Sequence, residues 1–399
     1  MLEAKNSDRI GLLLSGGGAR AAYQVGVLRA IAELLPKDAS NPFHIISGTS
    51  AGALNAASLA CHAHRFRTGV KLLEHLWKNI SSDQIYTPQS GKLLGSASTL
   101  LLSSVRKKSA DVPRSLLDNS PLTELLQRVL KLNKIQGNID KGLLDALSIT
   151  ASAYSTGESV SFYQGMNGLV DWEGPHRIGR RGQLSHAHLL ASAALPVLFP
   201  AVKIDNQFYG DGSVRQLAPT STPIHLGATR LLVVGVSGNR LKTPLEDKMT
   251  APPSISQIIG HMLNSAFVDT LDNDLEFLRN MNDVLEQMPE NIRNSAKVSA
   301  QKIELLEISP SIEINLLATE FYDELPRQMA KHIKPDTSST LLSLVLFEKG
   351  FCSALWKMGY EDALAKETEI RQFFRRQSQS IKPLHHMAGA STGEGPIAC

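Results

Sequence analysis

The sequence predicts an α/β fold built around a parallel sheet. Residues 10–14 form a short apolar run typical of a buried strand, and glycines separate it from a helical pattern over residues 21–35 that ends before Pro36. Residues 42–47 predict a second strand, and residues 51–60 predict a helix rich in small side chains. This strand–helix–strand–helix order is typical of parallel sheets, in which the loops at the carboxyl ends of the strands face one crevice.

The turn between the second strand and its helix is expected to carry a serine in a strained conformation. It runs from Gly48 to Gly52 and leaves no room for an ordinary loop, so Ser50 must lie on the turn itself. Small neighbours at Gly48 and Gly52 make that conformation tolerable. The hydroxyl is then expected above the strand ends, where the N-terminus of the next helix directs free N–H groups. The G-x-S-x-G pattern is short and can match by chance, so the motifs before and after it are needed to decide whether Ser50 is functional.

Three interpretations fit the glycine-rich loop after the first strand. Residues 16–21 match the dinucleotide-binding pattern G-x-G-x-x-A, but that site requires an acidic residue at the end of the second strand, where Ser47 and Gly48 stand. A structural turn is the second interpretation, although successive glycines are more permissive than a turn requires. An oxyanion hole is the third, because glycines leave backbone N–H groups open to a substrate carbonyl.

Residues 66–147 carry mostly helical patterns and are predicted to form an insertion over the sheet. Within it, apolar residues at helical spacing over residues 93–105 precede the basic run Arg106–Lys108. This stripe favours a helix that packs on the core and has a solvated end. Contact with an anionic lipid surface is the alternative interpretation.

Strand patterns return after the insertion, at residues 147–154 and 159–163, and are expected to extend the sheet. Residues 185–200 predict a short helix and a proline-bracketed apolar loop. Such a loop can wall an apolar pocket or pack in the core, and the two interpretations are compatible. Residues 201–209 predict a hairpin around an Asp-Asn pair, and this hairpin delivers Asp211. An aspartate before a glycine is by itself usually a turn residue.

The C-terminal part is predicted to combine further strands and helices. Buried strands are expected at residues 230–236 and 303–308, and helices at residues 254–280, 318–332, 339–358 and 360–375. Residues 377–399 lack periodicity and are predicted to be a disordered tail. We therefore expect one domain over residues 1–376, with a motif-bearing core over 9–240, the insertion over 66–147 and a C-terminal helical part over 241–376.

The composition limits the classes of partner and compartment. The 399 residues include 41 basic and 38 acidic ones and carry a net charge of +3, which argues against binding of nucleic acid by the protein as a whole. Three widely spaced cysteines without a C-x-x-C pair argue against disulfides and zinc sites, and they fit a reducing compartment. Neither a signal peptide nor a membrane-spanning run of about 20 apolar residues is recognisable. The expected location is therefore the cytoplasm.

Four motifs together, in this order, resemble the patatin-like phospholipase family: Gly16 to Arg20, Gly48 to Gly52, Ala193 to Pro200, and Asp211-Gly212. The resemblance covers residues 9–240, and the remainder is similar to the helical tail of a bacterial-type member. The resemblance implies a three-layer α/β/α fold with a central, mostly parallel sheet. It also implies hydrolysis of acyl esters in lipids, of the phospholipase A or lysophospholipase type, by a Ser-Asp dyad that works without histidine.

Carried over by position, the resemblance makes Ser50 the nucleophile, Asp211 its base and Gly16, Gly17 and Gly18 the oxyanion hole. Residues expected to support these groups are Arg20, which fixes the glycine loop, together with Gly48, Gly52 and Gly212. The expected reaction passes through an acyl-enzyme and needs no metal or other cofactor. The expected partner is a lipid or other acyl ester, with peripheral contact to a membrane.

The chain departs from the family pattern just after the predicted base. Ser213 stands where the family usually has glycine or alanine, and an asparagine common a few residues later is replaced in the run Val214–Pro219, which includes Leu217. These departures put the hydrogen bonding of this loop in question.

Two other functions stay open at this point. An α/β-hydrolase would use a Ser-Asp-His triad, and His225 and His261 follow Asp211 in the required order, although Ser50 comes early in the chain for that fold. A catalytically silent module of the same fold would bind lipid or protein instead. It predicts lipid binding that Ser50→Ala leaves unchanged.

Overall fold

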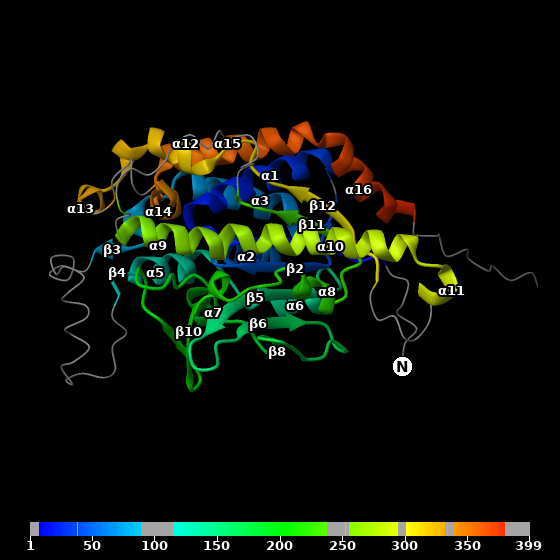
Figure 1. Cartoon of the computed structure of the whole chain (residues 1–399). Coiled ribbons are helices and arrows are strands. Elements are labelled where there is room, and N and C mark those ends of the chain that lie inside the picture. The colour runs from blue at the N-terminus through cyan, green and yellow to red at the C-terminus, as the bar shows by residue number, and fades with distance from the viewer. Residues whose placement is uncertain are drawn as a thin grey trace, which may run out of the picture.

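The computed structural model describes residues 8–37, 39–88, 115–237, 252, 255–293, 301–331, 333 and 339–379. In this part of the chain, a mixed sheet lies between helices that pack on both of its faces (Figure 1). The predicted α/β fold in three layers is therefore confirmed.

Parallel strands form one half of the sheet, in the order β12-β11-β1-β2-β5. Their bounds are β1 (Ile10–Leu14), β2 (Ile45–Thr49), β5 (Ala146–Ala153), β11 (Arg230–Val234) and β12 (Glu304–Ile308). All residues of β1, β2, β5 and β11 are buried. Burial on both faces explains why these strands read as continuous apolar or small runs rather than as alternating patterns.

Antiparallel pairing appears beyond β5. β6 (Ser159–Gly165) runs antiparallel to β5, and β8 (Arg177–Arg181) and β7 (Trp172–Gly174) follow it at the edge. The sheet is therefore less uniformly parallel than predicted. The sequence analysis misses β7 and β8, because these short, partly exposed segments show no apolar alternation.

The hairpin of β9 (Val202–Ile204) and β10 (Gln207–Asp211) pairs with the part of β5 that extends beyond the end of β2. β2 pairs with β5 as far as Thr49 opposite Thr150. β10 pairs with the next residues of β5 from the opposite direction, and ends with Asp211 opposite Ala151. The carboxyl ends of β2 and β10 therefore meet beside β5.

Helices on one face of the sheet build the larger apolar core, around α1 (Ala22–Leu34) and α15 (Lys349–Ala365), which lie side by side above the sheet in Figure 1. The other helices with residues in this core are α2 (Ala51–Cys61), α3 (Phe66–Lys78), α5 (Ser120–Val129), α6 (Lys134–Asp140), α7 (His186–Ser192), α9 (Ile255–Asn264), α12 (Ile314–Glu320), α13 (Arg327–Ala330), α14 (Ser339–Val345) and α16 (Glu367–Gln379).

The long helix α10 (Thr270–Gln287) covers the opposite face, where Leu271 and Leu275 pack with Leu13 of β1 and with β11. A π-helical turn, Ser265–Asp269, joins it to α9. α8 (Ser221–His225) contacts β1 and β2, and the short α11 (Glu290–Arg293) follows α10.

Several predicted boundaries in the helical parts need correction. The insertion contains α3, α5 and α6 together with a short strand pair, β3 (Thr87–Pro88) and β4 (Leu117–Asp118). The predicted helix at 318–332 is displaced, because α12 ends at Glu320 and only the short α13 follows. The break expected after residue 358 lies instead around residues 346–348 and at Lys366.

Two predicted segments lie wholly or largely outside the described residues. These are the apolar stripe with its basic run, residues 93–108, and residues 380–399 of the expected tail. The expected tail begins inside α16, which extends to Gln379. Within the described ranges, no helix combines the length and the apolar character that crossing a bilayer requires.

Candidate active site

Ser50 lies on the sharp turn between β2 and α2, as predicted. Its φ is +54° and its ψ is −131°, a conformation that costs a side-chain-bearing residue free energy. A Cβ at Gly48 would lie 2.5 Å from the carbonyl oxygen of Gly52, and a Cβ at Gly52 would lie 2.4 Å from that of Leu14. Glycine at both positions therefore lets the strained turn pack against β1.

The hydroxyl of Ser50 donates a hydrogen bond to Asp211 at an Oγ–Oδ2 distance of 2.6 Å. Both residues are buried, with 2% of Ser50 and 0% of Asp211 exposed. The other carboxylate oxygen, Oδ1, accepts from the backbone N–H of Ser213 at 2.9 Å. The structure thus brings together the two residues predicted as nucleophile and base, although they are far apart in the sequence.

Burial changes the acidity of Asp211. It raises the pKa of this carboxyl group from 3.8 to about 7, against the opposing effect of the hydrogen bonds from Ser50 and Ser213. A carboxylate with a pKa near neutrality is a stronger base than an ordinary aspartate. It is half ionised at a pH equal to its pKa and mostly ionised about one pH unit above it. This is the electrostatic requirement for taking a proton from serine.

Ser192 and Gln216, which the sequence does not mark as site residues, hold the end of β2 and Ser50 in place. Ser192 accepts from the backbone N–H of Ser50 at 2.9 Å, and its hydroxyl donates to the carbonyl of Thr150 at 2.6 Å. Gln216 accepts from the hydroxyl of Thr49 at 2.6 Å and donates to the hydroxyl of Thr150 at 3.2 Å. Both residues therefore link the end of β2 to β5.

The departures from the family pattern have a structural explanation. Ser213 donates its backbone N–H to Asp211, a bond that glycine or alanine would also supply. Its side chain adds a further effect that lowers the pKa of Asp211. Gly212 is required, because a Cβ there would lie 2.2 Å from the carbonyl oxygen of Thr150. Leu217 is 68% exposed, whereas Gln216 beside it is buried and bonded to β2 and β5. Within the run after Ser213, the polar contacts to β2 and β5 thus come from Gln216 and not from Leu217.

The glycine loop lies against the same site. Gly18 and Ser50 line one cavity, and Gly16, Gly17 and Gly18 are all buried. Gly18 has a φ of +54°, and a Cβ on it would lie 2.1 Å from the carbonyl oxygen of Leu344. A Cβ on Gly17 would lie 2.5 Å from the side chain of Val236. At Gly17 and Gly18 the loop is therefore enclosed between α14 and the residues just after β11, with no space for side chains there.

Arg20 points from this loop into the C-terminal part of the chain. Its side chain is buried, and its Nε and Nη2 donate to the hydroxyl of Ser343 at 2.9 and 2.7 Å. Nη2 also donates to Oδ1 of Asn315 at 2.7 Å. Arg20 is predicted to fix the loop, but no local pattern in the sequence indicates its distant partners Ser343 and Asn315.

An apolar cavity of about 290 Å³ extends from Ser50 along α2. One face of α2 forms its floor with residues at helical spacing, Leu54, Ser58 and, just beyond the helix end, His62. At 1.5 Å per residue, the distance from Ser50 to His62 is about 18 Å. The remaining walls are mostly aliphatic and aromatic side chains of α3 and α5 with Leu195, Phe199 and Phe347. The predicted loop 193–200 does wall a pocket.

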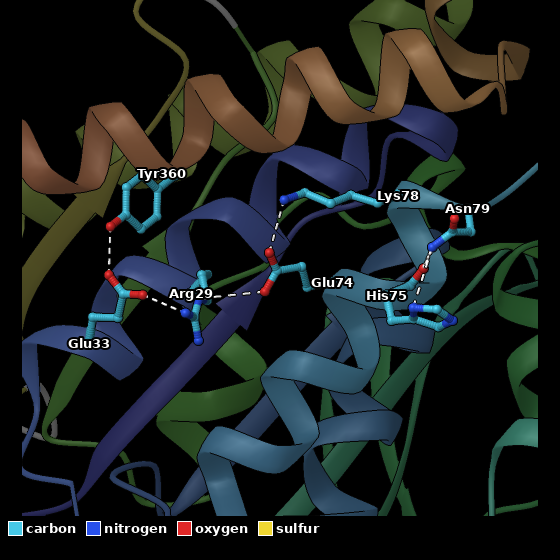
Figure 2. A network of polar contacts seen from close by, with 7 residues as sticks. All are labelled: Arg29, Glu33, Glu74, His75, Lys78, Asn79 and Tyr360. Carbon is cyan, nitrogen blue, oxygen red and sulfur yellow. Dashed lines mark hydrogen bonds and ion pairs between the residues drawn. The ribbon is translucent and has the colours of Figure 1, made fainter.

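Figure 2 shows how α3, one wall of this cavity, is held from its other side. Glu74 of α3 pairs with Arg29 of α1 and with Lys78, at N–O distances of 3.5 and 2.9 Å. Glu33 of α1 pairs with Arg29 and accepts from the hydroxyl of Tyr360 on α15. This network fixes α3 to α1 and α15 while its apolar residues face the cavity.

The histidines considered for a triad lie elsewhere. His225 is exposed, its ring stacks on Trp172 with centroids 5.2 Å apart, and its Nδ1 lies 2.7 Å from the carbonyl oxygen of Ser221. His261 is an exposed residue of α9. Among the residues that the structure describes, no histidine hydrogen-bonds with Ser50 or Asp211.

Comparison with known proteins identifies relatives over part of the chain. It is 26% identical to the cGAMP-activated phospholipase of Pseudomonas aeruginosa over 227 residues, which cover 54% of this chain and 55% of that protein. It is 51% identical to lysophospholipase nte1 of Aspergillus terreus over 51 residues, 13% of this chain and 3% of that protein. The chain thus spans about half the length of the first relative and a small fraction of the second.

Similar solved structures are also found. Human GIVD cytosolic phospholipase A2 matches at 12% identity and a TM-score of 0.44, with 95% of this chain and 62% of that chain covered. VipD from Legionella pneumophila matches at 14% identity and a TM-score of 0.34, with 91% and 67% covered.

The family comparison covers the part of the chain that carries the site. The model of the patatin-like phospholipase domain matches residues 12–224, which include the glycine loop, Ser50 and Asp211 and make up more than half of the sequence. The chain therefore belongs to the patatin-like phospholipase family.

Proposed function

We propose that this protein hydrolyses acyl-ester bonds of lipids through a Ser50–Asp211 dyad. The observation that carries this proposal is the 2.6 Å hydrogen bond from Ser50 Oγ to Asp211 Oδ2, at one end of an apolar cavity. A buried serine beside a buried carboxylate needs no third residue to lose its proton if the carboxylate is sufficiently basic. The raised pKa of Asp211, about 7, supports that condition.

In the proposed acylation step, Ser50 Oγ attacks the ester carbonyl carbon and its proton passes to Asp211. The carbonyl oxygen becomes an oxyanion, which the N–H groups of Gly16–Gly18 would stabilise. The tetrahedral intermediate then collapses, the bond to the alcohol oxygen breaks, and Asp211 returns the proton to that oxygen. The products are an alcohol and an acyl-Ser50 ester.

In the proposed deacylation step, water takes the place of the alcohol. Asp211 accepts a proton from the water as its oxygen attacks the acyl carbon, and the same glycine loop stabilises the second oxyanion. Collapse of this intermediate releases the fatty acid, and the proton returns to Ser50 Oγ. The positive φ of Ser50 supports both steps, because it directs the side chain above the strand ends.

The shape of the cavity supports a substrate with a long acyl chain. Because staggered C–C bonds of about 1.5 Å advance an alkyl chain by about 1.25 Å per carbon, the roughly 18 Å along α2 match about 14 carbons. We therefore propose a phospholipase A or lysophospholipase type of reaction. The proposal includes peripheral contact with a membrane and a cytoplasmic location, which the unpaired, buried Cys61 and Cys352 support.

The experiment that tests the dyad is intact-mass measurement after treatment with a fluorophosphonate. We expect one adduct on the wild type and on the control Ser221→Ala, because Ser221 is half-buried on α8 and its hydroxyl lies beside His225. We expect none on folded Ser50→Ala. A folded wild type that takes no adduct would favour the silent binding module. Loss of ester hydrolysis in folded His225→Ala or His261→Ala would favour the triad instead.

A further inference from the structure

The glycine loop is in contact with a part of the chain that lies beyond the family match. Arg20, at the end of the loop, reaches Ser343 of α14 and Asn315 of α12, whereas the match ends at residue 224. The sequence separation between Arg20 and Ser343 is 323 residues. A contact of this range requires that the C-terminal helices fold back over the first βα turn.

We propose that Ser343 is a positioning residue for lipid hydrolysis, because through the buried guanidinium of Arg20 it holds the glycine loop in its reactive conformation. The inference rests on the proposed function, in which the N–H groups of this loop bind the oxyanion. Ser343 itself lies on α14 and is completely buried. It acts on the reaction through Arg20 and is not itself assigned contact with the substrate.

The geometry around Ser343 is specific. Its hydroxyl oxygen accepts hydrogen bonds from both Nε and Nη2 of Arg20, which lie along one edge of the planar guanidinium. The same hydroxyl lies 2.7 Å from the carbonyl oxygen of Thr340 and 3.0 Å from Oδ1 of Asn315, which also accepts from Arg20. Arg20, Ser343 and Asn315 therefore hydrogen-bond pairwise with one another, which fixes the guanidinium in orientation as well as in place.

We call Arg20, Ser343 and Asn315 the clamp. The main chain of α14 also contacts the glycine loop. The residue after Ser343 is Leu344, whose carbonyl oxygen would lie 2.1 Å from a Cβ on Gly18. The backbone N–H of Arg20 donates to the carbonyl oxygen of Gly17 at 3.1 Å. A displacement of Arg20 should therefore also displace Gly17. α14 thus contacts the glycine loop through its backbone and holds the end of the loop through the hydroxyl of Ser343.

A shift in this loop should affect the rate of the chemical step more than substrate binding. In the proposed function the acyl chain would lie in the cavity between α2, α3 and α5, and none of these helices contains Arg20, Ser343 or Asn315. Donors to an oxyanion, by contrast, gain their interaction in the transition state. Loosening the loop is therefore expected to lower kcat and to leave KM nearly unchanged.

The experiment is a double-mutant cycle on the full chain with a long-chain p-nitrophenyl ester. We expect Ser343→Ala to lower kcat about tenfold, with KM changed less than about twofold. Ser343→Thr, which keeps the hydroxyl, should recover part of the loss. In an Arg20→Ala background, Ser343→Ala should add less than about a twofold further loss, because its effect passes through Arg20. Thr319→Ala is the matched control, because this hydroxyl bonds within its own helix, to the carbonyl of Leu316.

Other results of this experiment would contradict the role of Ser343. An unchanged kcat in folded Ser343→Ala, or an equal loss with and without Arg20, would overturn the positioning role while leaving the dyad intact. If Ser343→Ala does not fold, Asn315→Ala tests the same clamp from its partly exposed side, with the same criteria. A folded wild type that neither hydrolyses the ester nor takes a fluorophosphonate adduct would overturn both the proposed function and this inference.

Discussion

Asp211 reaches Ser50 across the end of β2, because β10 continues along β5 from the point at which β2 stops. The two strands approach from opposite directions, so their last residues face each other. The Oγ–Oδ2 distance of 2.6 Å is therefore a result of strand register and does not depend on a flexible loop. Changes to either side chain should affect catalysis without disturbing the sheet.

Asp211→Asn should lower kcat by about 10²- to 10⁴-fold, because an amide of the same shape cannot accept the serine proton. Ester hydrolysis in the steady state measures this effect, with circular dichroism as the test of folding. Asp205→Asn, in the turn of the β9–β10 hairpin, is the control and should behave like the wild type. Activity of Asp211→Asn within about twofold of the wild type would assign the base to another residue.

The pH dependence of activity should follow the ionisation of Asp211. Its carboxyl group must be ionised to act as a base, and burial raises its pKa to about 7. We expect kcat/KM to rise with pH and to level off above about pH 7. A profile that is already level at pH 5, where an ordinary aspartate is ionised, would contradict the raised pKa.

Stability should change with pH in the opposite direction. The pKa of Asp211 is higher in the folded than in the unfolded chain, so the folded state binds more protons between pH 3.8 and about 7. The free energy of unfolding contributed by Asp211 should therefore fall as pH rises through that window. Denaturant titrations of wild type and Asp211→Asn at several pH values isolate this contribution. A difference between the two proteins that does not change with pH would speak against the shift.

Gly18→Ala should impair both stability and catalysis. The residue has a φ of +54°, and the new Cβ would lie 2.1 Å from the carbonyl oxygen of Leu344. Strain of this kind costs on the order of 1–3 kcal/mol, so we expect a lower midpoint of denaturation and a lower kcat. Gly137→Ala in α6 is the control, because a Cβ there meets nothing within 4 Å, and it should stabilise slightly if at all. Equal behaviour of the two variants would show that the loop is not confined as described.

Ser58→Phe should change the preference for acyl-chain length. Ser58 lines the cavity eight residues after Ser50, so a ring there should block the cavity about 12 Å from the nucleophile. We expect kcat/KM for butyrate esters to stay close to that of the wild type and that for palmitate esters to fall at least tenfold. Val284→Phe, on the exposed side of α10, is the control. An equal fall for both chain lengths would place the acyl chain elsewhere.

The sequence was sufficient for those parts of the fold that local patterns determine. The apolar run at residues 10–14 and most of the run at 230–236 lie in fully buried strands, the second of which ends at Val234. The small residues around Ser50 allow only a sharp turn. Partly exposed strands such as β7 and β8 gave no comparable pattern and were missed. The break between α14 and α15 was also missed, because the apolar pattern continues across it.

The residues that hold the site together could not be identified by the same means. Ser192 and Gln216 are common polar residues whose importance comes from meeting Thr150 of β5 in space. Ser343 depends on a contact with Arg20 that spans most of the chain. Such contacts depend on tertiary packing, and a single sequence has no local pattern that indicates them.

Because the chain is synthesised from its N-terminus, the partners in the long-range contacts become available at different times. A ribosome would release the glycine loop and Ser50 before Asp211, which follows Ser50 by 161 positions, and Ser343, the partner of Arg20, later still. A nascent chain would therefore hold Ser50 without Asp211, and then this pair without the contact that holds Arg20. If the proposed hydrolysis takes place, chains that end before Ser343 should therefore cleave lipid only weakly.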